Sequence, residues 1–150
     1  HDGAAISENV AILDLLADRE PQLGLGGPLA RTRLIETLSY LSSEVHVAFK
    51  PLFLGAIETD KAKAREAIAG RIESLEARKV GPYLFGDRFT VADAYLTVVL
   101  SWSRATPLDL AKWPNLKNYI SRMRKRPSIA KALEIENPLY LEEQASHPAA

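Results

Sequence analysis

The sequence contains no cysteine among its 150 residues, so the chain forms no disulfide and offers neither a thiolate metal ligand nor a cysteine nucleophile. An excess of charge of one sign is also lacking, because 19 basic residues balance 19 acidic ones. This balance argues against a general binder of polyanions such as nucleic acid. No apolar run approaches the length that spans a bilayer. We therefore expect no nucleic-acid partner, no membrane contact and a cytoplasmic location.

Signals for β-strands are missing as well, since no alternating β-branched runs are joined by Asn-Gly or Asp-Gly turns. The clearest pattern is instead a ladder of apolar side chains from Leu34 to Leu52, spaced three or four residues apart as in the seam of a helical bundle. Pro51 should kink or end this helix. The sequence thus predicts an all-α helical bundle. Its helices are expected at about residues 7–19, 28–54, 59–80 (capped by Thr59 or Asp60) and 90–104, with one starting at 113–114 and a short one starting at 127.

One stretch divides the chain by its composition. Residues 21–28 are rich in glycine and proline, which is typical of a linker. We therefore expect residues 1–20 to form a separate helical element and residues 29–139 to form the main helical domain. Residues 140–150 are expected to be a loosely held tail.

The helix expected from residue 90 has a well-marked start. Thr90 can cap the first turn with its hydroxyl, and Asp93 can accept a hydrogen bond from the Thr90 backbone N–H, which together make a capping box. The negative charge of Asp93 also suits the positive end of the helix dipole. The pattern predicts a buried apolar face formed by Val91, Ala94, Tyr95, Val98 and Trp102.

His46 is the side chain most suggestive of chemistry. It follows Val45 on the apolar ladder, so it points about 100° away from the core-facing seam. Lys50 lies one turn further on the same face, and Phe49 and Phe53 are nearby in the sequence. Two interpretations stay open: a histidine that lines a cleft, or a partly exposed histidine without a special role.

Other chemistries find little support. His46 is far in sequence from His1 and His147, and no second ligand stands at helical spacing from any of them, so we expect no metal site. The glycines of the linker follow no strand and do not form a phosphate-binding loop. The basic run Arg122–Arg126 can contact phosphate or an acidic partner, but it also suits a helix C-terminus, where cations complement the dipole.

Several segments, in the same order, resemble the bacterial, beta-like branch of the cytosolic glutathione transferase family. The segment at residue 8 resembles the start of the last helix of that family's thioredoxin-like domain, and the others resemble its C-terminal helical domain. The residues concerned are Glu8–Ile12, Ser43–His46 with Phe49 and Pro51–Phe53, Gly86–Asp93, Trp113–Leu116 and Arg126–Ser128.

The resemblance implies an enzyme that lets the thiolate of glutathione attack a hydrophobic electrophile, as in detoxification. Carried over by position, Glu8 and Asn9 would bind the γ-glutamyl end of glutathione, with Asn9 standing where serine is more usual. His46 would lie near the thiol. Phe49 and Trp102 would form walls for the second substrate. Glutathione is then a substrate, and no metal is implied.

The resemblance also implies what surrounds this chain. The residue that hydrogen-bonds the thiol would lie upstream of His1, so the parent protein is the expected enzyme and the chain alone is expected to be inactive. A homodimer is implied, with the exposed side of residues 29–43, including Tyr40, as the expected contact. The alternative is a free-standing, non-catalytic helical interaction module. Convergence of His46, Phe49 and Trp102 on one cleft facing the first helix would favour the enzyme, and packing of the three residues apart from one another would favour the module.

Overall fold

The computed structural model describes residues 3–54, 57–78, 81–104, 106 and 108–146. Within these residues the chain forms seven α-helices with short 3-10 turns between some of them and no β-strand, so the all-α prediction is confirmed. Two isolated bridges lie in the loop before residue 90. None of the described helices is long and apolar enough to cross a membrane. The helices are α1 (Asn9–Arg19), α2 (Ala30–Tyr40), α3 (Val47–Phe53), α4 (Glu58–Ala77), α5 (Val91–Ser101), α6 (Pro114–Lys125) and α7 (Pro127–Ser146).

The helix predicted over residues 28–54 is present as one long rod with an irregular centre. α2 continues into a π-helical segment, Leu41–His46, which leads directly into α3. Pro51 lies inside α3, and the helix ends two residues later at Phe53. The proline ring removes a backbone donor and crowds the carbonyl of Val47, which explains the early end.

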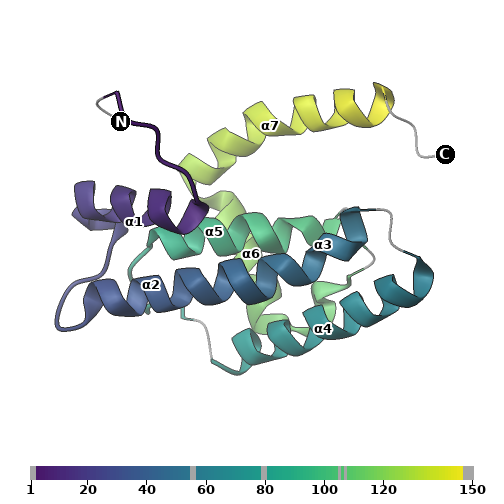
Figure 1. The fold of residues 1–150 in the computed structure, drawn as a ribbon, viewed down its shortest axis with the longest axis horizontal. Coiled ribbons are helices and arrows are strands. Elements are labelled where there is room, and N and C mark those ends of the chain that lie inside the picture. The colour runs from purple at the N-terminus through teal and green to yellow at the C-terminus, as the bar shows by residue number, and fades with distance from the viewer. Residues whose placement is uncertain (1–2, 55–56, 79–80, 105, 107, 147–150) are drawn as a thin grey trace.

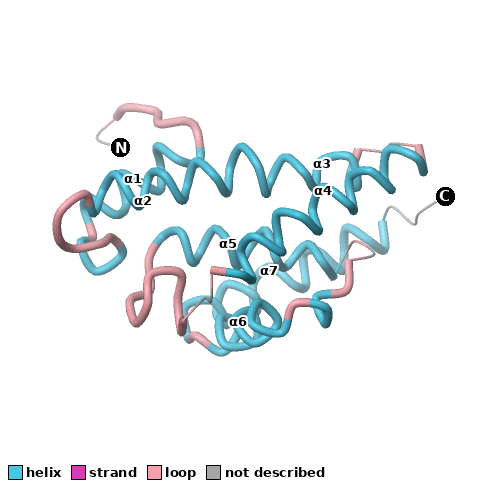
Figure 2. Tube along the Cα trace, turned by 90° about the horizontal axis from the view of Figure 1, so that it is seen from below, coloured by secondary structure: helices cyan, strands magenta, loops and turns pink. Residues whose placement is uncertain are grey.

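α5 occupies the middle of the bundle. It contacts α1, α2 and α6, while α3 packs on α4 and α4 on α6. In Figure 1 the rod of α2 and α3 crosses in front of α5, and in Figure 2 it lies along one side of the molecule, with α6 on the opposite side. The core is built from one apolar face of each of these helices. Its fully buried members include Leu34, Leu38, Leu41, Val45, Phe49, Ile68, Ile72, Leu96, Leu100, Leu116 and Tyr119.

The predicted inner face of α5 is only partly right. Val91 and Tyr95 are buried as expected, but Val98 is 54% exposed. The helix is surrounded on most sides, so Leu96, Val99 and Leu100 are buried too and a single-stripe pattern does not apply.

The starts of α1 and α4 differ from the prediction. α1 starts after Glu8 rather than after Ser7. α4 starts at Glu58, with the Ile57 carbonyl accepting from the N–H groups of Asp60 and Lys61, so neither Thr59 nor Asp60 is the cap.

α7 is longer than the short helix we predicted and half-buries Ile129 and Leu133 at its start. It runs through residues 140–146, where we predicted a tail, because its exposed residues keep their backbone hydrogen bonds inside the helix. Residues 147–150 of that predicted tail lie outside the described part.

Candidate functional site

His46 lies at the end of the π-helical segment and is exposed. Its ring nitrogen Nδ1 is 2.8 Å from the hydroxyl oxygen of Tyr95 on α5. The ring also meets Trp102 edge-on, with centroids 4.8 Å apart and planes inclined by 78°. His46 is therefore held by two side chains that are distant in sequence, one on α5 and the other directly after it.

Trp102 is the hub of a cluster of rings. Besides His46 it contacts Phe49 at 5.6 Å and Phe53 at 5.5 Å between centroids, both edge-on. We call His46, Phe49, Phe53, Tyr95 and Trp102 the aromatic cluster. Its members come from the π segment, α3, α5 and the 3-10 turn Trp102–Arg104 that follows α5. Edge-to-face contacts of this kind favour a fixed mutual geometry.

Trp102 brings His46 and Phe49 together in this cluster, but none of the three lines the pocket beside α1 that is described below. Phe49 differs from the expectation in one respect, because it is 0% exposed and supports Trp102 from the core side. Val45, one turn earlier on the ladder, is buried in the same way, so the apolar seam includes Phe49. Phe53, which is 47% exposed, is the second ring at the surface beside Trp102.

Glu8 and Asn9 lie at the N-terminus of α1, and both are exposed. The first turn of α1 contains no acidic residue, so its N–H groups form an end that favours a bound carboxylate. Glu8 is the N-cap, with a positive φ of 68°. α1 packs on α2 and α5. Among the described residues, no recorded contact joins Glu8 or Asn9 to the aromatic cluster.

The predicted capping box is present and is part of a larger buried network. Asp93 is 0% exposed, and its Oδ2 accepts from the Thr90 N–H at 2.8 Å and the Thr90 hydroxyl at 2.9 Å. Its Oδ1 accepts from the Leu84 N–H at 2.8 Å and from the Tyr119 hydroxyl at 2.9 Å. Burial, and next the charge of Asp93, raise the pKa of Tyr119 far above its ordinary value. This network fixes the start of α5, and Thr90, Asp93 and Tyr119 are closed off from solvent.

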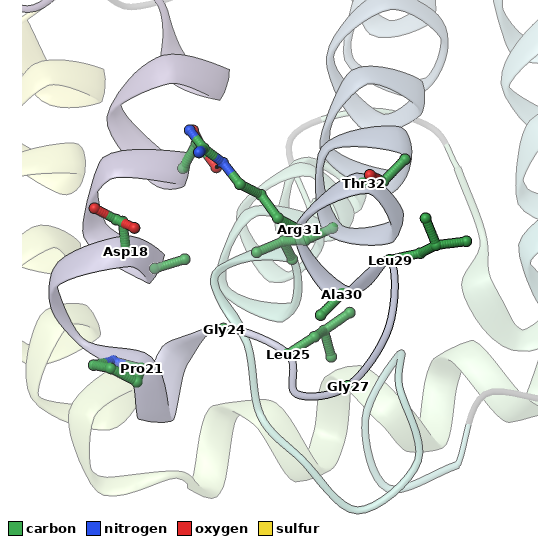
Figure 3. A pocket seen from close by; sticks show the side chains of 12 residues that line it. Asp18, Pro21, Gly24, Leu25, Gly27, Leu29, Ala30, Arg31 and Thr32 are labelled. Atoms are coloured by element: carbon green, nitrogen blue, oxygen red, sulfur yellow. Dashed lines mark hydrogen bonds and ion pairs between the residues drawn. The ribbon is translucent and has the colours of Figure 1, made fainter.

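A pocket of about 630 Å³ lies between α1, the linker and α2 (Figure 3). Arg31 of α2 reaches across it to Asp14 of α1 with two hydrogen bonds, of 3.0 and 2.6 Å. This pair raises the pKa of Arg31. Sequence reasoning missed both the pocket and the pair, since the two residues stand on either side of the linker. The pocket does not include His46.

The basic run at the end of α6 has structural partners. Arg122 donates to the carbonyl of Gly81 at 2.9 Å, and the guanidinium of Arg126 lies 3.8 Å from the centre of the Phe89 ring. These contacts favour the interpretation as a helix C-terminus, whose arginines hold the loop between α4 and α5. In the described part of the chain, no group of three or more histidine or acidic residues could hold a metal ion. His1 and His147 lie outside that part.

Two acidic side chains of α4 that sequence reasoning missed hold α6 in place. Glu73 accepts from the indole N–H of Trp113 at 2.7 Å. Glu76 accepts from the N–H groups of Asn115 and Leu116, both at 2.9 Å, and so caps the start of α6. No local motif signals such a cap, because its donor and acceptor are separated by about 40 residues.

Comparison with known proteins agrees with this architecture. Residues 40–127 match the family model of the glutathione S-transferase C-terminal domain. Glutathione S-transferase GstA of Escherichia coli O157:H7 is 36% identical over 140 residues, which cover 90% of this chain and 70% of that protein. A glutathione transferase structure from Methylococcus capsulatus shares 37% identity with a TM-score of 0.84, covering 91% of this chain and 70% of that one. A sphingomonad glutathione S-transferase, solved with glutathione, is 36% identical to this chain with a TM-score of 0.84. The match covers 91% of this chain and 70% of that one.

The fold is thus the C-terminal helical domain of glutathione S-transferases. The chain belongs to the glutathione S-transferase family, and its relatives of known structure include bacterial beta-class members.

Proposed function

We propose that the protein carrying this chain conjugates the thiolate of glutathione to a hydrophobic electrophile. The observation that carries the proposal is the aromatic cluster, in which an exposed histidine contacts Tyr95 and Trp102, and Trp102 in turn contacts Phe53. The histidine supplies a polar group next to an apolar wall, which is the combination that a thiolate and a hydrophobic substrate require together.

Each site residue has a distinct proposed role. Glu8 and Asn9 bind the γ-glutamyl end of glutathione, helped by the N–H groups at the start of α1. His46 lies near the thiol. Trp102 forms the wall for the electrophile together with Phe53, and Phe49 supports Trp102 from behind. Chemically, the thiol proton leaves to solvent, and the sulfur forms a bond to carbon as the leaving group departs.

We also propose that residues 1–20 are the last helix of a thioredoxin-like domain and that residues 29–139 are the helical domain. That first domain would supply the hydrogen bond to the thiol, so the chain alone should be inactive. Ile12 and Leu16, the exposed apolar side chains of α1, suit a helix that packs on such a domain. We further propose detoxification as the role, a cytoplasmic location and a homodimer through the exposed side of residues 29–43.

The test is a titration of the isotopically labelled chain with glutathione, followed by NMR. Glutathione should shift the amide signal of Asn9 and the ring signals of His46. The analogue γ-glutamyl-alanyl-glycine, which lacks only the thiol, should shift Asn9 but leave His46 nearly unchanged. The variant Asn9→Ala should weaken binding of both peptides, whereas Asn115→Ala, at the start of α6, should not. Binding that leaves Asn9 and His46 unaffected would contradict the proposed site.

Conjugation of a chlorinated nitrobenzene to glutathione tests whether residues 1–150 are inactive without the proposed thioredoxin-like domain. We expect the chain alone to give no rate above the uncatalysed reaction, because in this proposal the thioredoxin-like domain supplies the group that activates the thiol. A turnover well above the uncatalysed rate by residues 1–150 would refute this part of the proposal.

A further inference from the structure

His46 is held more firmly than its exposure requires. Surface histidines are free to turn about two side-chain bonds, yet this ring is fixed by Tyr95 at one nitrogen and by Trp102 along one edge. Tyr95 is itself only 7% exposed, so the hydroxyl that contacts His46 is positioned by the core. Fixing an exposed side chain costs conformational entropy, and the arrangement therefore points to a use for a fixed ring.

The backbone next to His46 supports the same conclusion. The chain leaves α-helical geometry at Leu41 and returns to it directly after His46. Such π-helical segments are rare and concentrate at functional sites. Within this segment Leu41 and Val45 stay fully buried, so the wider turn keeps its core contacts while His46 lies against α5.

The direction of the hydrogen bond follows from the chemistry of the two groups. A phenol hydroxyl is a stronger donor than a neutral imidazole N–H, and an unprotonated imidazole nitrogen is a stronger acceptor than a phenol oxygen. In neutral His46 the Tyr95 hydroxyl therefore donates to Nδ1, and Nε2 carries the ring proton. No partner of Nε2 is recorded among the described residues, so this N–H is available to a ligand.

We propose that Tyr95 is a positioning residue: it fixes His46 as the tautomer that presents Nε2–H as a donor to the sulfur of bound glutathione. The inference rests on the proposed function, because that function supplies the sulfur. A donor aimed at a thiolate stabilises the anion, while the thiol proton is released to solvent. Tyr95 itself does not touch the substrate. Its role is to keep one ring nitrogen occupied and the other correctly oriented.

The first arm of the test needs no ligand. Histidine ring nitrogens are followed by long-range proton–nitrogen NMR on ¹⁵N-histidine-labelled chain at pH about 8.5, above the ordinary histidine range. The chain has three histidines, and the variant His46→Gln identifies the signals of this one. We expect Nδ1 to appear as fully unprotonated and Nε2 as protonated. In Tyr95→Phe both signals should move toward the values of a tautomer mixture, and the ring should become more mobile on the nanosecond scale.

Tyr83→Phe is the matched control, since it removes a phenol hydroxyl from a ring that packs on Phe89 instead of His46. It should leave both nitrogen signals of His46 unchanged. If circular dichroism shows that Tyr95→Phe does not fold, the wild-type chain alone is used to test the proposal. A hydroxyl proton of Tyr95 coupled to Nδ1 supports the proposal, and its absence contradicts it.

The second arm adds glutathione and separates this inference from the proposed function. We expect glutathione to move the Nε2 signal of wild-type His46, and Tyr95→Phe to lose most of that response while the Asn9 shift keeps its midpoint. Equal Nε2 responses in both proteins would overturn the positioning role and leave the proposed function standing. Loss of every glutathione shift in the wild type would overturn the proposed binding of glutathione by Glu8, Asn9 and His46 and the contact with sulfur. A wild-type Nδ1 that carries the proton would overturn the proposal outright.

Discussion

Replacing Asp93 by asparagine should strongly destabilise the fold. The carboxylate accepts four hydrogen bonds from Thr90, Leu84 and Tyr119 in a fully buried site. In asparagine one oxygen becomes an NH₂ group, which confronts two donors whichever way the amide is turned. The hydroxyl of Tyr119 or Thr90 can rotate to accept, but the backbone N–H of Leu84 or of Thr90 cannot. One buried backbone donor is therefore left without a partner.

The magnitude follows from two contributions. An unsatisfied buried donor costs about 1–3 kcal/mol, and loss of the charge weakens the remaining hydrogen bonds by a similar amount, so we expect about 2–6 kcal/mol in total. In urea, with a slope of about 2 kcal/mol per molar for a chain of this size, the unfolding midpoint should fall by about 1–3 M. Far-UV circular dichroism measures this directly.

Asp109→Asn provides the control. Asp109 also caps a helix, accepting from the Ala111 N–H at 2.8 Å, but it is exposed. Asparagine and aspartate are nearly equivalent at such caps, so the midpoint should change by less than about 0.3 M. A shift of similar size in both variants, or a midpoint for Asp93→Asn within about 0.5 M of wild type, would refute the reasoning that burial makes this network costly to disturb.

Two further predictions concern pH and assembly. Because burial and Asp93 hold the pKa of Tyr119 far above that of the unfolded chain, the stability from the protonated phenol is complete below pH about 10 and is lost above it. The difference in unfolding free energy between wild type and Tyr119→Phe should then shrink by about 1.4 kcal/mol per pH unit above 10, measured from urea unfolding midpoints. A difference that stays constant above pH about 10 would contradict this prediction. The proposed homodimer predicts a light-scattering mass of twice 16.5 kDa, and a monomer at high micromolar concentration would count against it.

The sequence predicted those features that depend on local spacing. The apolar ladder from Leu34 and the capping box of Thr90 and Asp93 are both present, because each involves residues within about one helical turn. Tyr119 and Leu84, which complete the buried network, were not predictable in this way. They reach Asp93 only after α6 and the loop before α5 have packed.

The same distinction applies to the candidate site. His46 and Trp102 could be proposed as site residues from their positions and the family resemblance, but Tyr95 was assigned only to the apolar face. Its hydroxyl finds His46 across 49 residues of sequence, and the π-helical turn that brings them together has no sequence signature that we could use. Phe49 shows the converse, since a ring next to a site in sequence can belong wholly to the core.

The two tryptophans lie in different surroundings, so their fluorescence reports on two different parts of the molecule. Trp113 is 5% exposed with its indole N–H bound to Glu73, whereas Trp102 is half-buried beside His46. The emission of Trp113 should therefore report unfolding of the core, while that of Trp102 should respond to ligands and to the charge of the imidazole. The single variants Trp102→Phe and Trp113→Phe would each leave one of these fluorophores. Events at the surface and loss of the fold could then be followed separately in the same unlabelled protein.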